Sequence, residues 1–353
     1  VAVSVFMLSG RKISLMQRST MQDAISAPKV GGIVRLTKFI LRGTFLIEAL
    51  GAVLLFPVFC RDFGIKGIWM SVFHSISAFC NAGFDILGTT DHTFVSLTGY
   101  SRNIWLNIVI MLLIILGGIG FLTWEDFYTN KFKFKRYRMQ SKVILITTAI
   151  LIIAPAVFFF ACDFGNLPAG KRLLASVFQS VTTRTAGFNT EDLSLMTEAG
   201  KAVMILLMLI GGSPSSTAGG MKTTTFAVLI LNALATFRSR EDAGAFGRRF
   251  DGQVVKNAAT IAMMYFMLFF FGGITISVYE GLPLLTCLYE AASAVGTVGL
   301  TLGITPELHI ISRLILIALM YLGRVGGMTL IYAVFSRKNN NGAKMPLEKI
   351  TVG

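Results

Sequence analysis

Charged side chains are scarce in this sequence. Only 14% of its 353 residues are Asp, Glu, Lys or Arg, whereas 54% are hydrophobic. A soluble protein of this length could not bury so much apolar surface. Two apolar runs, residues 104–122 and 143–162, are each long enough to cross a hydrocarbon core of about 30 Å. The sequence therefore predicts an all-α integral membrane protein and excludes the soluble globular classes.

Metal-ligating and catalytic side chains are also few. Four cysteines and three histidines are present, and none has the spacing of a metal site or a CxxC motif. They are Cys60, Cys80, Cys162 and Cys287, with His74, His92 and His309. We expect the cysteines to be buried free thiols and the histidines to be structural. Because no His, Asp, Glu and Cys cluster falls at one membrane depth, we expect neither an enzyme nor a resident metal.

Acidic residues are outnumbered by basic ones, 18 to 32, which gives a net charge of +14. The basic residues gather in stretches that separate or follow apolar runs, near residues 10–38, 130–138, 237–249 and 336–349. This is the positive-inside pattern, so we expect these links and the C-terminus in the cytoplasm. A nucleic-acid partner is not expected, because the sequence lacks stacking aromatics and a recognition fold.

Between the basic links the chain repeats one plan. An apolar span is followed by a short amphipathic segment, a glycine-containing turn and a second span. Because each unit starts and ends on the cytoplasmic side, the short segment must enter from outside and return. The plan divides the chain into residues 1–35, 36–138, 139–252 and 253–353. We expect spans near residues 38–60, 101–127, 141–162, 199–236, 256–279 and 308–335.

The re-entrant segments share one ending. They read VFHSISAFCNAGFD (72–85), VFQSVTTRTAGFNT (177–190) and LYEAASAVGTVGLT (288–301). Non-helical backbone at membrane depth is tolerated only where it is buried or lines a cavity. Glycine permits the φ values that turn carbonyl groups toward one axis, where they replace the hydration shell of an ion. We expect a filter made of Asn81, Ala82, Gly83, Phe84, Thr185, Ala186, Gly187, Phe188, Thr297, Val298, Gly299 and Leu300. Ordinary external turns are the alternative.

The ordered motifs SAFCNAGF, TTRTAGF and SAVGTVGL resemble the Trk/Ktr/HKT superfamily of potassium transporters. The resemblance implies pseudo-fourfold repeats of helix–pore loop–helix around a central pore. It also implies potassium uptake across a bacterial cytoplasmic membrane. Three pore loops lie in this sequence, and residues 1–10 resemble the tail of a first repeat. A first pore loop is therefore expected before Val1.

A polar stretch, GGSPSSTAGGMKTTT (211–225), lies between apolar runs. Met221 separates Gly220 from Lys222, so the Walker A spacing is absent and we expect no nucleotide on this chain. Pro214 and the glycines should break this helix in mid-membrane. The resemblance implies that the break is a gating loop, while a kink for helix packing is the alternative. The expected gate residues are Gly211, Gly212, Ser213, Pro214, Ser215, Ser216, Thr217, Ala218, Gly219, Gly220, Lys222 and Arg324.

Arg324 stands within an apolar run, where an arginine is costly and usually faces a cavity or a partner. It aligns with Thr217, so we expect it to donate hydrogen bonds to the gating loop. Snorkelling to the interface is the alternative for Arg324 and for Lys222.

Other polar residues lie near the expected filter. Asp85 and Asn189 follow their triplets and either attract cations or cap turns. Arg184 is expected to pair with Glu290 and brace the filter, with capping or surface charge as the alternative. Glu48 is expected to form a hydrogen bond between helices.

KTTTF after the polar stretch and the short C-terminal MPLEKITVG resemble the membrane subunit of bacterial Ktr systems. That resemblance implies a homodimer regulated by a cytoplasmic ring of RCK-type nucleotide-binding subunits. K+ is the implied transported ion and Na+ a second candidate. Two alternatives stay open: a sodium-conducting or sodium-coupled relative, and an alternating-access transporter of a small solute.

Overall fold

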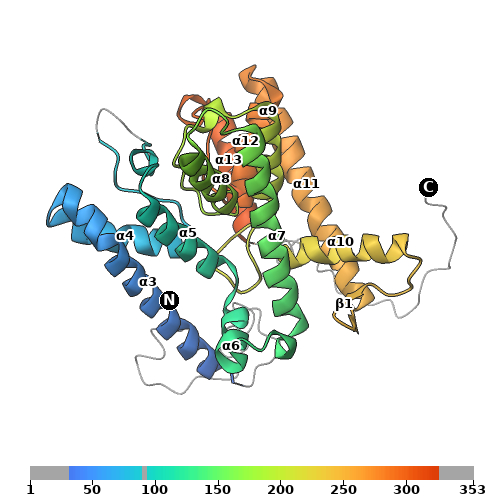
Figure 1. Cartoon of the computed structure of the whole chain (residues 1–353). Helices are drawn as coiled ribbons and strands as arrows, with labels where there is room; N and C mark the ends of the chain where they lie inside the picture. Colours follow the sequence, from blue (N-terminus) through green and yellow to red (C-terminus); the bar gives the residue numbers. More distant parts are fainter. Residues whose placement is uncertain (1–31, 90–93, 326–353) are drawn as a thin grey trace.

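The computed structural model describes residues 32–89 and 94–325 (Figure 1). A long helix, a short helix and a broken or shorter helix follow one another three times in the described chain. The first group is α3 (Ile33–Phe63), α4 (Lys66–Phe79), α5 (Ile104–Gly118) and α6 (Phe121–Asn130). The second is α7 (Met139–Cys162), α8 (Ala169–Thr182), α9 (Glu198–Leu209) and α10 (Thr223–Phe237). The third is α11 (Gly252–Glu280), α12 (Leu284–Gly296) and α13 (Ile310–Val325).

Short elements connect these helices. Four 3₁₀ turns lie at Thr98–Tyr100, Phe134–Arg136, Leu193–Leu195 and Thr305–Glu307. A small hairpin joins α10 to α11, in which β1 (Gly244–Ala245) pairs antiparallel with β2 (Arg248–Arg249).

Local sequence explains where several helices begin. The side chain of Asn103 accepts a hydrogen bond from Leu106 N at the start of α5. Thr197 caps α9 through Gly200 N, and Asp251 caps α11 through Gln253 N. These side chains satisfy amide groups that a helix start leaves without a partner.

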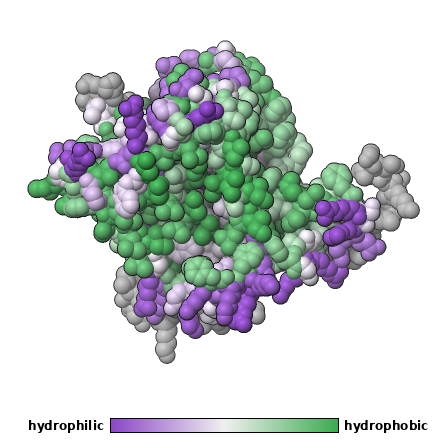
Figure 2. Space-filling view, viewed as in Figure 1, coloured by the Kyte–Doolittle hydropathy of each residue, from purple (hydrophilic) through white to green (hydrophobic). Residues whose placement is uncertain are grey.

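The described helices α3, α7 and α11 are each long and apolar enough to cross a membrane. The bent pair α5 and α6 would make a further span. Large apolar side chains on these helices are exposed, among them Phe45, Leu112, Ile153 and Phe271. Figure 2 shows hydrophobic side chains over the middle of the face, with hydrophilic ones along its lower edge and at the right. The chain is an all-α integral membrane protein, as predicted.

The expected span over 101–127 is not one continuous helix. The helix ends at Gly118 and restarts at Phe121, and the axes of α5 and α6 differ by 96°. A segment almost a hundred residues later in the chain binds at this bend, where Ser213 N donates to Gly118 O at 2.9 Å and Phe121 N to Ser215 O at 2.7 Å. The backbone of the bend therefore finds partners outside its own helix.

The expected break in the span over 199–236 is present. The helix stops at Leu209 and starts again at Thr223. In Figure 1, α10 lies across the direction of α7 and packs against α7 and α11.

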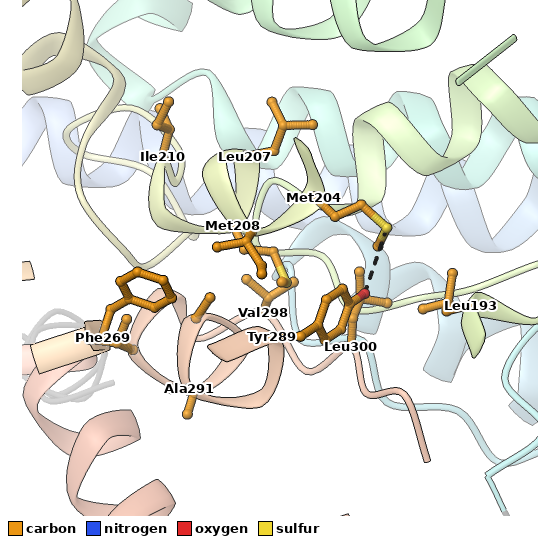
Figure 3. Packing of buried hydrophobic residues seen from close by; sticks show 14 of the residues in the cluster. Leu193, Met204, Leu207, Met208, Ile210, Phe269, Tyr289, Ala291, Val298 and Leu300 are labelled. Carbon is orange, nitrogen blue, oxygen red and sulfur yellow. Dashed lines mark hydrogen bonds between the residues drawn. The ribbon is translucent and has the colours of Figure 1, made fainter. Parts of the chain in front are cut away.

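Two buried apolar clusters hold the short helices, and both cross the boundaries between the groups. The first joins α3, α4 and α5 to α8, with Phe178 and Phe188 fully buried. The second joins α9 to α11, α12 and α13. In Figure 3, Tyr289 of α12 points its hydroxyl at the sulfur of Met204, 3.8 Å away in α9. Because the cores are shared, the C-terminal ends of the short helices converge.

Candidate functional site: three glycine turns and a polar loop

Each short helix runs into a turn that contains one of the predicted glycines. We call residues 81–84, 185–188 and 297–300 the glycine turns. In each turn the glycine has positive φ, at +70° for Gly83, +85° for Gly187 and +93° for Gly299. The residue two positions earlier also has positive φ, and the residue between them does not. When the sign of φ alternates between successive residues, their carbonyl groups point to the same side. A backbone in this conformation offers several oxygens to one ion.

The glycine turns lie against one another. A Cβ built on Gly83 would lie 2.5 Å from Ala186 O and 2.8 Å from Gly187 Cα. One on Gly187 would collide with Val298 O. A Cβ on Gly299 would lie 3.8 Å from Gly187 Cα. Close approach and positive φ both require glycine at the first two positions.

The residue that precedes each glycine by two carries an oxygen without a partner. Asn81 Oδ1, Thr185 Oγ1 and Thr297 Oγ1 are buried, and no described residue forms a hydrogen bond with them. Leaving a buried acceptor unsatisfied costs about 1–3 kcal/mol. Each oxygen stands at the same position of a turn that lies against the next one, and oxygens of this kind are ligands for a dehydrated hard cation.

Hydroxyl groups in the last turn of the short helices hold the glycine turns, and sequence reasoning missed them. Ser77 Oγ donates to Phe84 O at 2.7 Å and Thr182 Oγ1 to Phe188 O at 2.5 Å. In the third group Ser293 Oγ instead accepts from Gly299 N at 3.1 Å. A hydroxyl residue five or six positions before each glycine was the available signal.

The second motif, TTRTAGF, has one residue fewer before its glycine than the other two, and its turn closes with a different backbone bond. Ala82 N and Val298 N each bond to the carbonyl five residues back, on Ser77 and Ser293. Ala186 N bonds to Thr182 O, four residues back. The tighter closure uses one residue fewer, and Gly187 still reaches its neighbours.

The predicted ion pair between Arg184 and Glu290 is wrong. Neither residue belongs to an ion pair in the described part of the chain. The buried Glu290 carboxylate accepts from Thr301 Oγ1 at 2.6 Å, Leu302 N at 3.0 Å and Thr305 Oγ1 at 2.8 Å. Hydrogen-bond donors just after the third glycine turn have taken the place of the expected arginine.

The residues after the first two glycine turns form hydrogen bonds with backbone or with neighbouring return segments. Asp85 Oδ1 accepts from Leu87 N at 3.1 Å. Asn189 N donates to Ser96 Oγ, and Leu97 N donates to Asn189 O, so the two return segments are tied together. Asn189, Lys171 and Glu191 line a cavity of about 820 Å³. The Asp85 carboxylate therefore caps its own turn, whereas Asn189 joins two segments that are far apart in the sequence.

The polar loop, residues 210–222, is a closed structure between α9 and α10. Gly211 N donates to Met221 O at 2.8 Å, and Thr223 N to Gly212 O at 3.0 Å. Inside the loop Ser216 Oγ donates to Ser213 O at 2.6 Å. Pro214 needs no amide partner, which suits it to this irregular backbone.

The polar loop lies directly against two glycine turns. A Cβ on Gly219 would overlap Thr297 Oγ1, and one on Gly220 would lie 3.1 Å from Gly296 O. At the first glycine turn, Asn81 Nδ2 donates to Thr217 Oγ1 at 2.8 Å. The predicted gate residues and the predicted filter residues are therefore in contact.

Two basic side chains bind the polar loop. Arg324 Nη1 donates to Thr217 O at 3.3 Å, which is the expected contact. Lys222 Nζ donates to Ala218 O at 2.8 Å, so Lys222 holds the loop. A hydrogen bond from a charged donor is stronger than one between neutral groups, so both contacts help to hold the loop.

The other predicted residues have structural contacts. Glu48 joins α3 to α4, where Cys80 Sγ lies 3.8 Å from its carboxylate and Ser75 Oγ donates to its carbonyl. His74 is buried and stacks on Phe59 at 4.8 Å.

The cysteines are free thiols, as predicted, but most of them are less buried than predicted. Cys287 is buried, whereas Cys60 and Cys80 are partly buried and Cys162, the last residue of α7, is exposed. His309 contacts the Tyr279 ring edge-on. His92 lies outside the described residues.

Comparisons with known proteins identify the family of this chain. A family model described as TrkH, cation transport protein, matches residues 1–341. This chain belongs to the TrkH family. Potassium/sodium uptake protein NtpJ of Enterococcus hirae is 38% identical over 365 residues, covering 100% of this chain and 79% of that protein. Ktr system potassium uptake protein B of Bacillus subtilis is 33% identical over 359 residues, with the same coverage.

A solved structure extends the TrkH comparison to the fold. The potassium transporter TrkH from Vibrio parahaemolyticus matches with a TM-score of 0.72 and 16% identity. The match covers 90% of this chain and 68% of that one. The resemblance drawn from the glycine motifs is confirmed.

Proposed function

We propose that this chain is the ion-conducting subunit of a potassium uptake system. The supporting observation is the set of three unpartnered oxygens beside three left-handed glycines. K+ would shed its water for the oxygens of residues 81–84, 185–188 and 297–300. The Bacillus subtilis relative is named as a potassium uptake protein, and the Enterococcus hirae relative as a potassium/sodium uptake protein. Na+ is therefore the second ion to test.

The polar loop is proposed as the gate. It is proposed to block the path beside Thr297 and Asn81, while Arg324 and Lys222 hold its carbonyl groups. These two cations also repel an ion leaving the glycine turns. Opening requires residues 218–220 to leave the third glycine turn, with the bond from Lys222 to Ala218 O broken or moved.

The units 36–138, 139–252 and 253–353 are proposed as successive pseudo-fourfold repeats. The proposed setting is a bacterial cytoplasmic membrane with the C-terminus inside. The basic links would then face the cytoplasm, where Lys142 lies 5.9 Å from the Phe134 ring and 5.6 Å from the Phe246 ring. These contacts join the 130–138 link to the β1–β2 hairpin.

The partners follow from relatives whose names include the words Ktr system. A system implies more than one component. The proposed partners are a second copy of this chain and a cytoplasmic ring of RCK-type nucleotide-binding subunits, which would dock on the basic links.

Cation flux into liposomes tests filter and gate together, with the protein expressed from its own gene. Under K+ and Na+ gradients in turn, the flux should favour K+. Deleting residues 213–218, or the change Arg324→Ala, should raise it, because each removes contacts that hold the polar loop. Unchanged flux in both variants would refute the gate. No flux of either ion in any variant would favour the solute-transporter alternative.

A further inference from the structure

We propose that Thr217 is a specificity-determining residue, which fixes the orientation of the Asn81 amide in the first glycine turn. This inference rests on the proposed function of the glycine turns and the polar loop. It assigns to one residue of the polar loop a task in ion selection, separate from closing the path.

Thr217 uses all its polar atoms to join α4, α5 and α13. Its amide N donates to Gly117 O at 3.2 Å, and its carbonyl accepts from Arg324 Nη1 at 3.3 Å. Its hydroxyl donates to Phe79 O at 2.9 Å and accepts from Asn81 Nδ2 at 2.8 Å. Three of the four bonds go to α4, its following turn and α5.

The hydroxyl bond decides which end of the Asn81 amide faces away from Thr217. A hydroxyl has one hydrogen, and that of Thr217 is given to Phe79 O. Thr217 can then only accept from Asn81, so the NH₂ group must face it. Oδ1 is left buried and unpartnered, like Thr185 Oγ1 and Thr297 Oγ1 in the other turns.

Orientation matters more for Asn81 than for its threonine counterparts. A threonine hydroxyl offers lone pairs to a cation whichever way its hydrogen turns. An amide offers an oxygen at one end and two N–H donors at the other, and the donor end repels a cation. Without the Thr217 hydroxyl the Asn81 amide can rotate. For part of the time its NH₂ group then takes the position of Oδ1, and the first glycine turn offers the ion one oxygen fewer.

The same contacts separate Thr217 from the part of the loop that moves. Residues 213–217 bond to α4, α5 and α6, whereas Gly219 and Gly220 meet the third turn by close approach alone. Thr217 therefore stays on the first unit while residues 218–220 move aside. Its hold on Asn81 persists while ions pass.

The test is the ratio of K+ to Na+ flux in liposomes for Thr217→Val, which removes the hydroxyl and keeps the shape. The ratio should fall roughly threefold to tenfold, the range that one hydrogen bond supplies. Thr217→Ser should keep the ratio. Thr260→Val is the matched control, since that exposed threonine of α11 bonds only to Lys256 O in its own helix.

Asn81→Thr adds a second, independent arm. It places in the first turn the residue type of the other two, which needs no fixed amide. In the Asn81→Thr background, the further change Thr217→Val should leave the K+/Na+ ratio unchanged. In the natural background the same change should lower that ratio, so the two effects are not additive. An unaltered ratio in Thr217→Val with raised flux would overturn the inference and leave the gate standing. Loss of selectivity equal in Thr217→Ser and Thr217→Val would also overturn it.

Discussion

Among single residues, Glu290 departs most from what the sequence predicts. Its carboxylate satisfies two hydroxyl groups and one backbone amide that follow the third glycine turn. It thereby anchors the outer return of that turn to α12. An arginine was the simplest partner to expect from composition. The donors that bind Glu290 lie 11 to 15 residues away, and only the path of the turn brings them to it.

Replacing Glu290 should separate hydrogen bonding from charge. Glu290→Gln retains an acceptor for Leu302 N, and the threonine hydroxyls can reorient, so its stability should change little. Glu290→Leu leaves all three donors without that partner and should cost about 1–3 kcal/mol. Thermal unfolding in detergent measures the difference as a lower midpoint for Glu290→Leu. Equal midpoints for the two variants would show that the carboxylate does not brace the turn.

Among the helices, two breaks differ in how far the sequence predicts them. The break in the second unit was predictable, because Pro214 and the glycines of 211–220 cannot continue a helix at low cost. The break after Gly118 was not, because ILGGIGFL reads as continuous apolar helix. Its cause is tertiary, since backbone groups of Ser213 and Ser215 bind at the bend. A local pattern carries no signal for a partner that arrives from another unit.

Gly120 offers a test of that bend. Its φ is +89°, and a Cβ there would lie 2.5 Å from Pro214 O. Gly120→Ala should strain the bend and displace Pro214 and the rest of the polar loop. This displacement should raise K+ flux in liposomes. Gly99→Ala is the matched control, because that glycine has open space around its Cβ position. A folded Gly120→Ala protein with ordinary flux would mean that the loop closes the path without this contact.

At the scale of the whole molecule, sequence patterning predicted the fold class, the span–helix–turn order and the family. Apolar length and glycine spacing carry that information, because a bilayer restricts the backbone so strongly. The convergence of the turns was beyond that reasoning. It depends on the two cores that cross unit boundaries, such as the packing of Tyr289 on Met204. A fold shared at 16% identity shows how little of this packing is recorded in individual residues.

The central claim is that the oxygens at the glycine turns bind the transported ion. Its most direct test is anomalous diffraction from crystals of the protein, expressed from its own gene and grown in Rb⁺, a scattering substitute for K+. The account predicts an anomalous peak among the oxygens of residues 81–84, 185–188 and 297–300, and its loss when Na⁺ replaces Rb⁺. Crystals that diffract well and show no peak there, from protein that conducts Rb⁺ in liposomes, would contradict it.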